Sequence, residues 1–334
     1  MTVGWGLVGI GGHADKALAP AITAVEEARL VGVVSRDRQR AEDFAGRHGA
    51  ARAWTSYEEM LRDPEVDVVS VTTPNALHTE HVVAAARAGK HVLCDKPLAL
   101  THEDAERDVE ECRRAGVRLG IDFQMRHAAW ASKVRDLIGA GALGQPVAVQ
   151  AEQASGRVGF GGWRMDPDLA GLGSVYNIGV HLYDLLRFLL ASEVREVSAM
   201  LDTGRKPELE KLAMTLLRFE NGTLAYVNAN QAVVNPQHDV EVYGDKGRIR
   251  AVSLSRHQQE GELRVISDGQ EDITRETTED VFRRVVAYFC EAVTAGREPL
   301  ASGLDGLRSV EITEAIARSA REGRVVSVER AEVG

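Results

Sequence analysis

A lysine and a histidine, Lys96 and His181, have the clearest chemical potential in this sequence. Lys96 follows a predicted strand in the run Cys94-Asp95-Lys96-Pro97, and His181 follows a glycine-rich stretch that contains Asn177. A histidine titrates near neutral pH, and a lysine that is partly desolvated or flanked by charges can be tuned towards that range. Either residue could therefore give or take a proton as a general acid or base near neutral pH. Without further evidence, His181 could simply be a packed core residue and Lys96 a surface charge.

A glycine fingerprint near the N-terminus predicts a dinucleotide site. Gly9-Ile10-Gly11-Gly12-His13-Ala14 follows a predicted strand and opens a predicted helix. In that context the backbone N–H groups and the helix N-terminus can hold a pyrophosphate, whereas the glycines alone could simply form a turn. We therefore expect Gly9, Gly11, Gly12 and His13 to bind the cofactor.

The end of the second predicted strand indicates which cofactor is bound. Ser35-Arg36-Asp37 stands where NAD-binding proteins usually place a ribose-binding acid, and Arg40 follows one helical turn later. A hydroxyl and two guanidinium groups can receive a 2′-phosphate through charge-assisted hydrogen bonds. Ser35, Arg36 and Arg40 thus favour NADP(H) over NAD(H), although two arginines on a solvated helix face are the alternative.

Two further strand ends are expected along the nicotinamide end of the cofactor, because the carboxyl ends of parallel strands face the ligand crevice. The expected contacts there are Thr72, Thr73, Pro74, Asn75, His78, Asp95 and Lys96.

The elements that position these residues alternate between strands and helices, which predicts an N-terminal Rossmann domain over residues 1–123 with a doubly wound parallel sheet. The expected strands cover residues 3–10, 29–35, 66–72, 91–95 and 117–122. The expected helices cover residues 14–27, 38–46, 57–61, 79–88 and 101–115.

Residues 124–334 predict a different, α+β domain for substrate binding and oligomerisation, with an open, mostly antiparallel sheet that carries helices on one face. Strands are expected over residues 146–153, 194–201, 212–219, 222–229, 238–243, 247–251 and 262–266, and a closing helix over 306–322. A sheet face without helices would expose apolar side chains. We therefore expect a homodimer or homotetramer joined through these sheets.

Composition narrows the class of protein. The chain has 334 residues with a net charge of −10, which argues against nucleic-acid binding and favours a small substrate. No apolar run is long enough to span a membrane, and no export signal precedes the first strand, so we expect a cytoplasmic location. Cys94, Cys112 and Cys290 lack metal-ligand spacing, and we expect no metal site.

Several longer motifs resemble the glucose–fructose oxidoreductase/inositol dehydrogenase (Gfo/Idh/MocA) family. Residues 88–99, which read AGKHVLCDKPLA, are similar to a family signature that runs AGKH-V, two variable residues and EKPLA. Trp163-Arg164, the stretch from Gly171 to Asp184, and Tyr243-Gly244-Asp245-Lys246-Gly247 resemble later family motifs. The resemblance covers nearly the whole chain, and parts of it are most similar to a subgroup of NADPH-dependent reductases.

The resemblance implies an NAD(P)-dependent dehydrogenase or reductase that acts on a sugar, an anhydro sugar or a cyclitol. Lys96 and His181 would line the reacting carbon, and the Lys96–Pro97 peptide bond would be cis. Further substrate contacts are expected at Trp163, Arg164 and Asn177, with Asp184 shaping or supporting the site. Weaker candidates for substrate contact are Arg126, Tyr176 and His127. Loops near residues 160–168 and 235–237 would shape the pocket.

Two departures from the family pattern concern acids. Asp95 stands where the family has Glu, and Asn177 stands where an acid usually lies four residues before the histidine. An amide can hydrogen-bond a hydroxyl or the imidazole but cannot take a proton or stabilise imidazolium by charge. Asn177 therefore keeps open an alternative, a dinucleotide-binding sensor or regulatory subunit without turnover. A structural protein with a vestigial fold would bind no dinucleotide.

Overall fold

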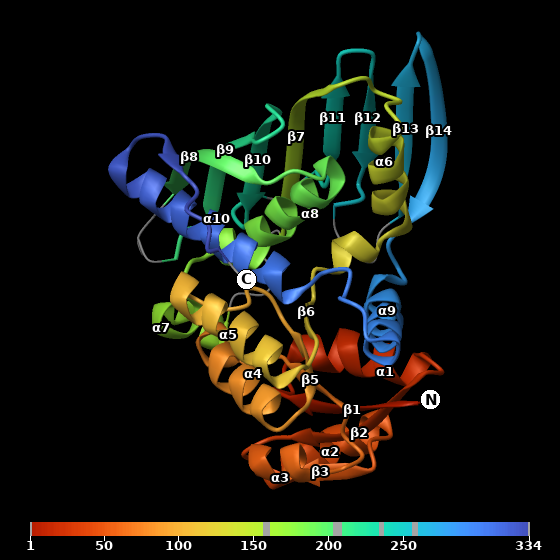
Figure 1. Cartoon of the computed structure of the whole chain (residues 1–334), viewed down its shortest axis with the longest axis vertical. Helices are drawn as coiled ribbons and strands as arrows, with labels where there is room; N and C mark the ends of the chain where they lie inside the picture. The colour runs from red at the N-terminus through yellow and green to blue at the C-terminus, as the bar shows by residue number, and fades with distance from the viewer. Residues whose placement is uncertain (1, 156–160, 203–208, 234–236, 256–259, 333–334) are drawn as a thin grey trace. The chain divides into compact units, whose positions relative to one another are not determined.

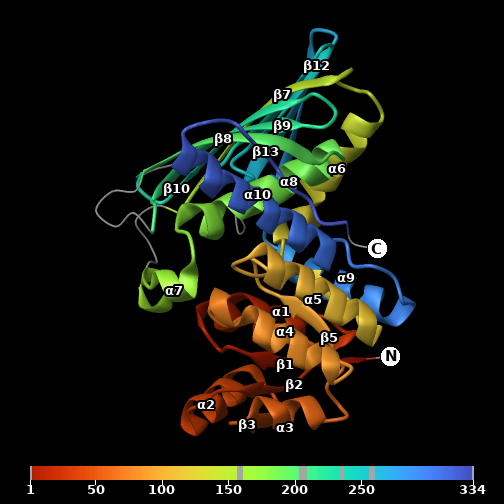
Figure 2. The ribbon, with the colours of Figure 1, turned by 60° about the vertical axis from the view of Figure 1, so that its left-hand side comes forward.

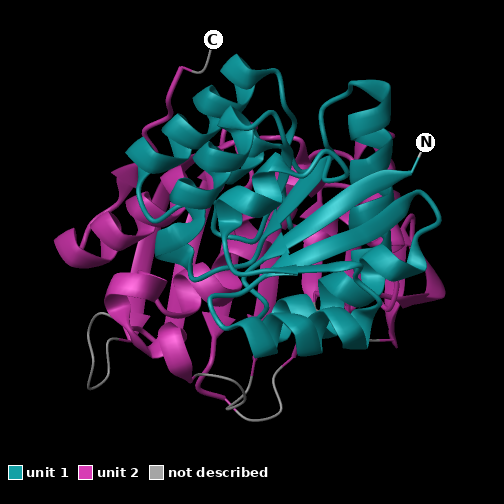
Figure 3. Ribbon diagram, turned by 90° about the horizontal axis from the view of Figure 1, so that it is seen from below, with its two compact units in different colours: residues 1–122, 282–307, 333–334 teal, residues 123–281, 308–332 magenta. Residues whose placement is uncertain are grey.

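The structure is a computed structural model that describes residues 2–155, 161–202, 209–233, 237–255 and 260–332. Phe160, Asn235 and Pro236, which belong to the expected pocket loops, lie outside the described residues. The chain divides into two compact units (Figure 3). Unit 1 contains residues 1–122, 282–307 and 333–334, and unit 2 contains residues 123–281 and 308–332. The sequence prediction places the domain boundary after residue 123 and assigns residues 282–307 to the second domain, whereas unit 1 contains residues 282–307.

Unit 1 is built on a six-stranded sheet in the order β3-β2-β1-β4-β5-β6, and each neighbouring pair is parallel. This is the doubly wound Rossmann arrangement that the sequence predicts. Its strands are β1 Val3–Val8, β2 Ala28–Val34, β3 Arg52–Trp54, β4 Val68–Val71, β5 His91–Cys94 and β6 Leu119–Ile121. Its helices are η1 Ala14–Leu18, α1 Ala19–Ala24, α2 Arg38–His48, α3 Tyr57–Arg62, η2 Asn75–Leu77, α4 His78–Arg87, α5 His102–Ala115 and α9 Val281–Ala295, which starts one residue before the unit boundary.

Local signals in the sequence set the helix ends of unit 1. The side chain of Thr101 accepts a hydrogen bond from the backbone N–H of Asp104 at 3.2 Å and so caps α5. The same helix ends at Gly116, whose φ of 68° is the left-handed conformation that favours glycine. The predicted elements of this unit are confirmed with small shifts at their ends, and β3 is an additional strand.

Residues 282–307 complete unit 1. The ring of Phe289 in α9 lies 5.7 Å from the ring of Trp5 in β1, measured between centroids. The backbone N–H of Ile121 in β6 donates to the carbonyl of Ala301 at 2.9 Å. The edge strand of the parallel sheet is therefore covered by a segment that lies far away in the sequence.

Unit 2 is built on a nine-stranded sheet in the order β14-β13-β12-β11-β7-β10-β9-β8-β15 (Figure 1). Only β7 and β10 pair in parallel among these described strands, so the predicted mostly antiparallel sheet is confirmed. Its strands are β7 Pro146–Ala154, β8 Val194–Asp202, β9 Leu212–Phe219, β10 Leu224–Asn230, β11 Val240–Gly244, β12 Gly247–Val252, β13 Glu260–Ser267, β14 Gln270–Thr277 and β15 Val326–Ser327.

Helices cover one face of this sheet (Figure 2). Among them, α10 is tied to β8 because the backbone N–H of Ala199 donates to Ser319 Oγ at 3.1 Å. The helical segments of unit 2 are η3 Gln124–His127, α6 Ala129–Gly139, η4 Gly162–Met165, α7 Pro167–Ala170, η5 Val175–Gly179, α8 Val180–Leu190 and the greater part of α10 Gly303–Glu322. The prediction of the closing helix is confirmed, whereas α6 and α8 are not predicted.

The opposite face of the sheet exposes apolar side chains. Met200 in β8, Leu216 in β9 and Leu224 in β10 are 82%, 58% and 48% exposed. A hollow on this face is lined by these neighbouring strands, with Leu216, Leu224 and Val325 among its side chains. None of the helices within the described ranges is long and apolar enough to cross a membrane.

Candidate active site

The glycine-rich loop of unit 1 touches the end of β4 so closely that only glycine fits. Gly9 has φ of 91°, and a Cβ there would lie 2.5 Å from the backbone of Thr72 and Thr73. Thr72 Oγ1 donates to the Gly9 carbonyl at 2.6 Å, so this hydroxyl holds the loop. A Cβ at Gly11 or Gly12 would meet no described atom within 4 Å. The first helical turn therefore faces open space in which backbone N–H groups can approach a phosphate.

The end of β2 presents cationic groups beside this loop. The carboxylate of Asp37 accepts from the backbone N–H of Arg40 at 3.1 Å and so caps α2. Arg40 Nη2 donates to the carbonyl of Ile10 at 3.1 Å, which holds its guanidinium against the loop. Ser35 is half-buried, and Arg36 is exposed. The carboxylate nearest to the expected ribose position is therefore engaged in its own helix, and two arginines lie nearby.

The loops after β4 and β5 lie next to each other, because Val71 and Cys94 are paired at the ends of these parallel strands. Within the described part of the chain, Thr73 Oγ1 has no hydrogen-bond partner although the residue is only 7% exposed. A ligand hydroxyl or amide could satisfy such a buried group. The backbone N–H of Lys96 donates to Asp95 Oδ1 at 2.8 Å. The Lys96–Pro97 peptide bond is cis, which confirms the prediction.

The remaining predicted contacts of unit 1 differ in burial. Asn75 is buried in η2, directly after Pro74, and His78 is fully buried at the start of α4. The ring of His78 lies between two backbone carbonyls, those of Pro97 and Thr73. Its buried side chain therefore contacts the backbone of the two loops that contain Thr73 and Lys96.

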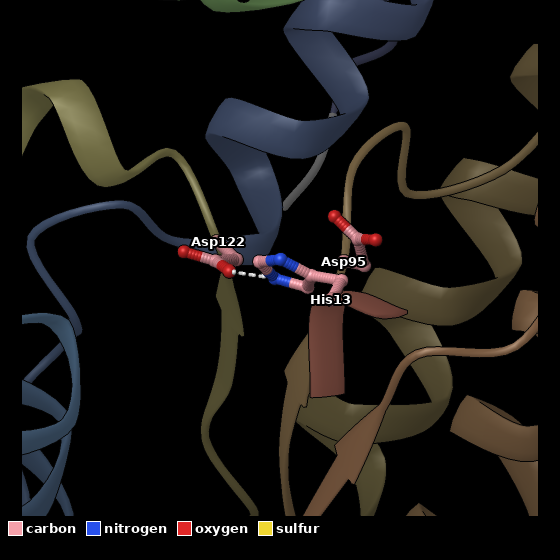
Figure 4. Close-up of side chains that lie close together, drawn as sticks. All are labelled: His13, Asp95 and Asp122. Carbon is pink, nitrogen blue, oxygen red and sulfur yellow. Dashed lines mark hydrogen bonds and ion pairs between the residues drawn. The ribbon is translucent and has the colours of Figure 1, made fainter. Parts of the chain in front are cut away.

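His13 reaches from the glycine-rich loop to the end of β6 (Figure 4). Its Nε2 is hydrogen-bonded to Asp122 Oδ2 at 2.8 Å, and the side chain of Asp122 is buried. Burial disfavours a charged imidazole, but attraction to Asp95 and the bond to Asp122 outweigh it and raise the pKa of His13. Sequence reasoning identified His13 but not its partner Asp122, which no local pattern reveals.

The same three residues have the composition of a metal site, since ligand atoms of His13, Asp95 and Asp122 lie within 4.8 Å of one another. The sequence predicts no metal. The imidazole and Asp122 are already hydrogen-bonded to each other, and the carboxylate of Asp95 accepts from the Lys96 N–H. We therefore describe the cluster as an ion pair beside the lysine loop.

In unit 2, the buried His181 lies in the first turn of α8. The π-helical segment η5 leads directly into this helix and contains the half-buried Asn177 and the buried Tyr176. Short π-helical segments inside helices are frequent at functional sites. Lys96 belongs to unit 1 and His181 to unit 2.

Glu210 holds the start of this helix, and the sequence analysis did not identify it. Its carboxylate accepts from the backbone N–H groups of Gly173 and Val175 at 2.8 and 2.7 Å, and its carbonyl accepts from that of Ser174 at 2.9 Å. A Cβ at Gly173 would lie 2.0 Å from this carbonyl oxygen. This close approach explains why residue 173, in the stretch from Gly171 to Asp184, is a glycine. Burial raises the pKa of Glu210 despite these hydrogen bonds.

Arg126 and Asp184 form a buried pair in unit 2. Arg126 donates from Nε and Nη2 to the two carboxylate oxygens at 2.8 and 2.7 Å, and Arg187 lies 3.5 Å from the same carboxylate. The guanidinium of Arg126 also lies 5.3 Å from the centre of the Phe188 ring. This geometry ties η3 to α8, so Arg126 and Asp184 support the helix of His181.

The other expected substrate contacts lie outside α8. The guanidinium of Arg164 lies 4.3 Å from the centre of the Trp163 ring, and both half-buried side chains belong to η4. The buried His127 lies next to Arg126 in η3. Within unit 2, the expected contacts thus form two pairs. Arg126 is paired with Asp184, and Arg164 lies against Trp163.

A Rossmann unit with a glycine loop, joined to a unit with a large open sheet, defines a class of dinucleotide-binding oxidoreductases. The comparisons agree with this class. Residues 3–123 match a family described as an oxidoreductase family with an NAD-binding Rossmann fold, and residues 131–250 match the Gfo/Idh/MocA C-terminal domain. The chain belongs to the Gfo/Idh/MocA family, as its motifs suggested.

Individual relatives cover nearly the whole chain. A 1,5-anhydro-D-fructose reductase from Ensifer adhaerens is 32% identical over 97% of this chain and 98% of its own length. A D-xylose 1-dehydrogenase (NADP(+)) from Haloferax volcanii is 31% identical over 97% and 99%. The crystal structure of an aldose-aldose oxidoreductase from Caulobacter crescentus, complexed with glycerol, has a TM-score of 0.91 and 30% identity over 98% and 100%. None of these three names describes a sensor or a regulatory subunit.

Proposed function

We propose that this protein is an NADP(H)-preferring dehydrogenase or reductase that acts on a carbinol or ketone carbon of a sugar, an anhydro sugar or a cyclitol, with NAD(H) as the less favoured cofactor. The observation that carries the proposal is family membership along both units, because the relatives named above all act on sugars or anhydro sugars by name. The intact Lys96 and His181 agree with turnover.

The cofactor fits the residues of unit 1. The open space beside Gly11 and Gly12 suits a pyrophosphate, and the orphaned hydroxyl of Thr73 suits a polar group of the cofactor. When bound, the nicotinamide supplies or accepts the hydride. The 2′-phosphate preference is supported by Arg36 and Arg40 and by the capping role of Asp37, which turns the nearest carboxylate to the helix.

This chain's own residues supply the proton chemistry. For reduction, we assign His181 or Lys96 as the donor of a proton to the carbonyl oxygen, and the other residue as a hydrogen-bond donor to it; for oxidation the proton moves the opposite way. Asn177, Trp163 and Arg164 are assigned to substrate hydroxyls, and Arg126 and Asp184 to the support of α8. The cytoplasmic location expected from the sequence stays a prediction.

We also propose self-association through the open face of the unit 2 sheet. The exposed Met200, Leu216 and Leu224 form an apolar surface that a second copy of the chain could bury. Light scattering at micromolar concentration should return a dimer or tetramer mass, and Leu216→Lys should reduce it. A monomer mass for the unaltered protein would contradict the proposal.

A panel of substrates run with both cofactors tests the proposed activity. Nicotinamide absorbance would be followed with aldoses, anhydro sugars, inositols and sugar phosphates, in both directions. We expect turnover with at least one of these compounds and a preference for NADP(H). Dinucleotide binding without turnover on any of them would instead favour the sensor alternative.

A further inference from the structure

His78 is a buried group of unit 1 to which the proposed chemistry gives no part. It begins α4, and its side chain is fully buried. Its Nδ1 lies 2.8 Å from the carbonyl oxygen of Pro97, and its Nε2 lies 3.0 Å from that of Thr73. One ring therefore spans the loops that follow two neighbouring strands, β4 and β5.

The two carbonyl oxygens that face the ring nitrogens of His78 can only accept hydrogen bonds. This limits where the proton of the ring can lie. Burial lowers the pKa of His78. The negative charge of Asp95 opposes this lowering, and the nearby His81 adds to it. A neutral imidazole carries one N–H and can donate to only one carbonyl. We assign that proton to Nδ1, because the oxygen of Pro97 lies closer than that of Thr73.

The bond to Pro97 matters because Lys96 directly precedes this residue. On one side, the N–H of Lys96 is held by Asp95 Oδ1 at 2.8 Å. On the other side, the carbonyl of Pro97 is held by His78. A lysine side chain is long and flexible, so the direction in which it leaves the backbone limits where its ammonium group can reach.

We propose that His78 is a positioning residue, which anchors the backbone of the Lys96 loop to the start of α4 through its hydrogen bond to the Pro97 carbonyl. This inference rests on the role proposed for Lys96, and it goes beyond the cofactor contact expected for His78 from the sequence. A small displacement of a reacting group by a change outside the chemistry can cost about 10²-fold in rate. His78 would therefore act on turnover without touching either reactant.

The test compares His78→Phe, which keeps a ring but removes both nitrogens, with His78→Gln, which keeps a donor. His81→Phe is the matched control, because His81 lies on the same helix and its Nδ1 contacts the carbonyl of Leu77 instead. Reductive methylation with a ¹³C label reports each lysine by NMR, and Lys96→Arg identifies the signal of Lys96. This readout needs no substrate, so it stands even if no sugar is turned over.

We expect His78→Phe to move the Lys96 signal and its titration midpoint, and to lower kcat by about 10- to 100-fold. His78→Gln should recover part of both effects, and His81→Phe should change neither. A folded His78→Phe protein with an unmoved Lys96 signal would overturn the proposal. In the unaltered protein, a long-range ¹H–¹⁵N spectrum should show the proton of His78 on Nδ1. A proton on Nε2 would refute the link to Lys96 even if the variants do not fold.

Discussion

The two units build their candidate site residues in opposite ways. In unit 1, the residues lie in loops after parallel strands, and backbone groups make many of the contacts, as with Gly9 against Thr72 and His78 against Pro97. In unit 2, His181 lies on a helix whose position depends on buried charges, Glu210 at its start and the Arg126–Asp184 pair along it. A dinucleotide site can thus be built from local backbone geometry, whereas the helix that carries His181 needs partners from distant segments.

The units also share a feature. The helix after the glycine loop begins with the π-helical segment η1, and the helix of His181 begins with η5. In each case the irregular turn lies at the end of the helix that carries the motif residues. Because π-helical turns are rare and often functional, their occurrence at both places supports the choice of these two regions.

The largest effects should come from the residues assigned to proton transfer, one in each unit. His181→Ala and Lys96→Ala should each lower turnover by about 10²–10⁴-fold, the range for lost general acid–base catalysis. Dinucleotide affinity should change little for His181→Ala, because unit 1 carries the proposed cofactor contacts. Steady-state kinetics and NADPH fluorescence titration would measure both quantities.

Lys133→Ala is a suitable control for the kinetic experiment, since Lys133 is an exposed lysine of unit 2. Near-normal turnover in His181→Ala would show that unit 2 does not supply the proton-transferring residue.

Replacing the arginines at the end of β2 in unit 1 should have a smaller effect, a loss of affinity for one cofactor only. Arg40→Ala and Arg36→Ala should weaken NADP(H) binding by about 1.5–3 kcal/mol, the value of a hydrogen bond to a charged group, and leave NAD(H) nearly unchanged. Arg38→Ala on the same helix should affect neither cofactor, because Arg38 pairs with Glu42 on the exposed surface. Equal losses for both cofactors would show that the two arginines do not receive the 2′-phosphate.

In unit 2, Glu210→Gln tests whether the buried carboxylate holds the helix of His181. The amide would turn an NH₂ group towards one of two backbone N–H donors, so one buried donor would lose its acceptor, at a cost of about 1–3 kcal/mol in the free energy of unfolding. Denaturant unfolding would measure this cost, with the exposed Glu260→Gln as the control. An unchanged free energy of unfolding would mean that the cap at Gly173 and Val175 contributes nothing.

The smallest effect concerns Asn177. An added anion favours the imidazolium form of His181, so Asn177→Asp should raise the pKa of that histidine and move its limb of the pH–rate profile to higher pH. The profile of kcat/KM against pH would show the change. If the limb stays in place while His181→Ala still abolishes turnover, residue 177 does not contact the imidazole.

The same contrast explains what could be predicted from the sequence. The parallel sheet and the cofactor loop follow from local patterns, because the glycines, caps and strand ends of unit 1 act within a few residues of one another. In unit 2, seven of the nine described strands are predicted from their alternation, whereas β14, β15 and the helix α8 are not predicted. Each residue of α8 is buried, so the polar side chains of His181, Asp184 and Arg187 mark no solvent-exposed face.

Long-range partners explain the remaining omissions. Glu210 meets Gly173 and Val175 across a gap of more than thirty residues, and Asp122 meets His13 across 109. Residues 282–307 return to unit 1 without any local signal that distinguishes them from their neighbours. Such contacts depend on tertiary packing, which periodicity and motif spacing do not encode.

Transfer of deuterium from the cofactor to a sugar would show whether this protein is an NADP(H)-dependent sugar oxidoreductase. NADPH carrying deuterium at the transferred position of its nicotinamide would be incubated with the protein and a keto or anhydro sugar that supports turnover, and the product would be analysed by mass spectrometry. We expect a product alcohol that carries the deuterium on its carbinol carbon, formed in step with NADPH oxidation. A protein that binds NADPH but leaves every sugar of the panel unlabelled would contradict it.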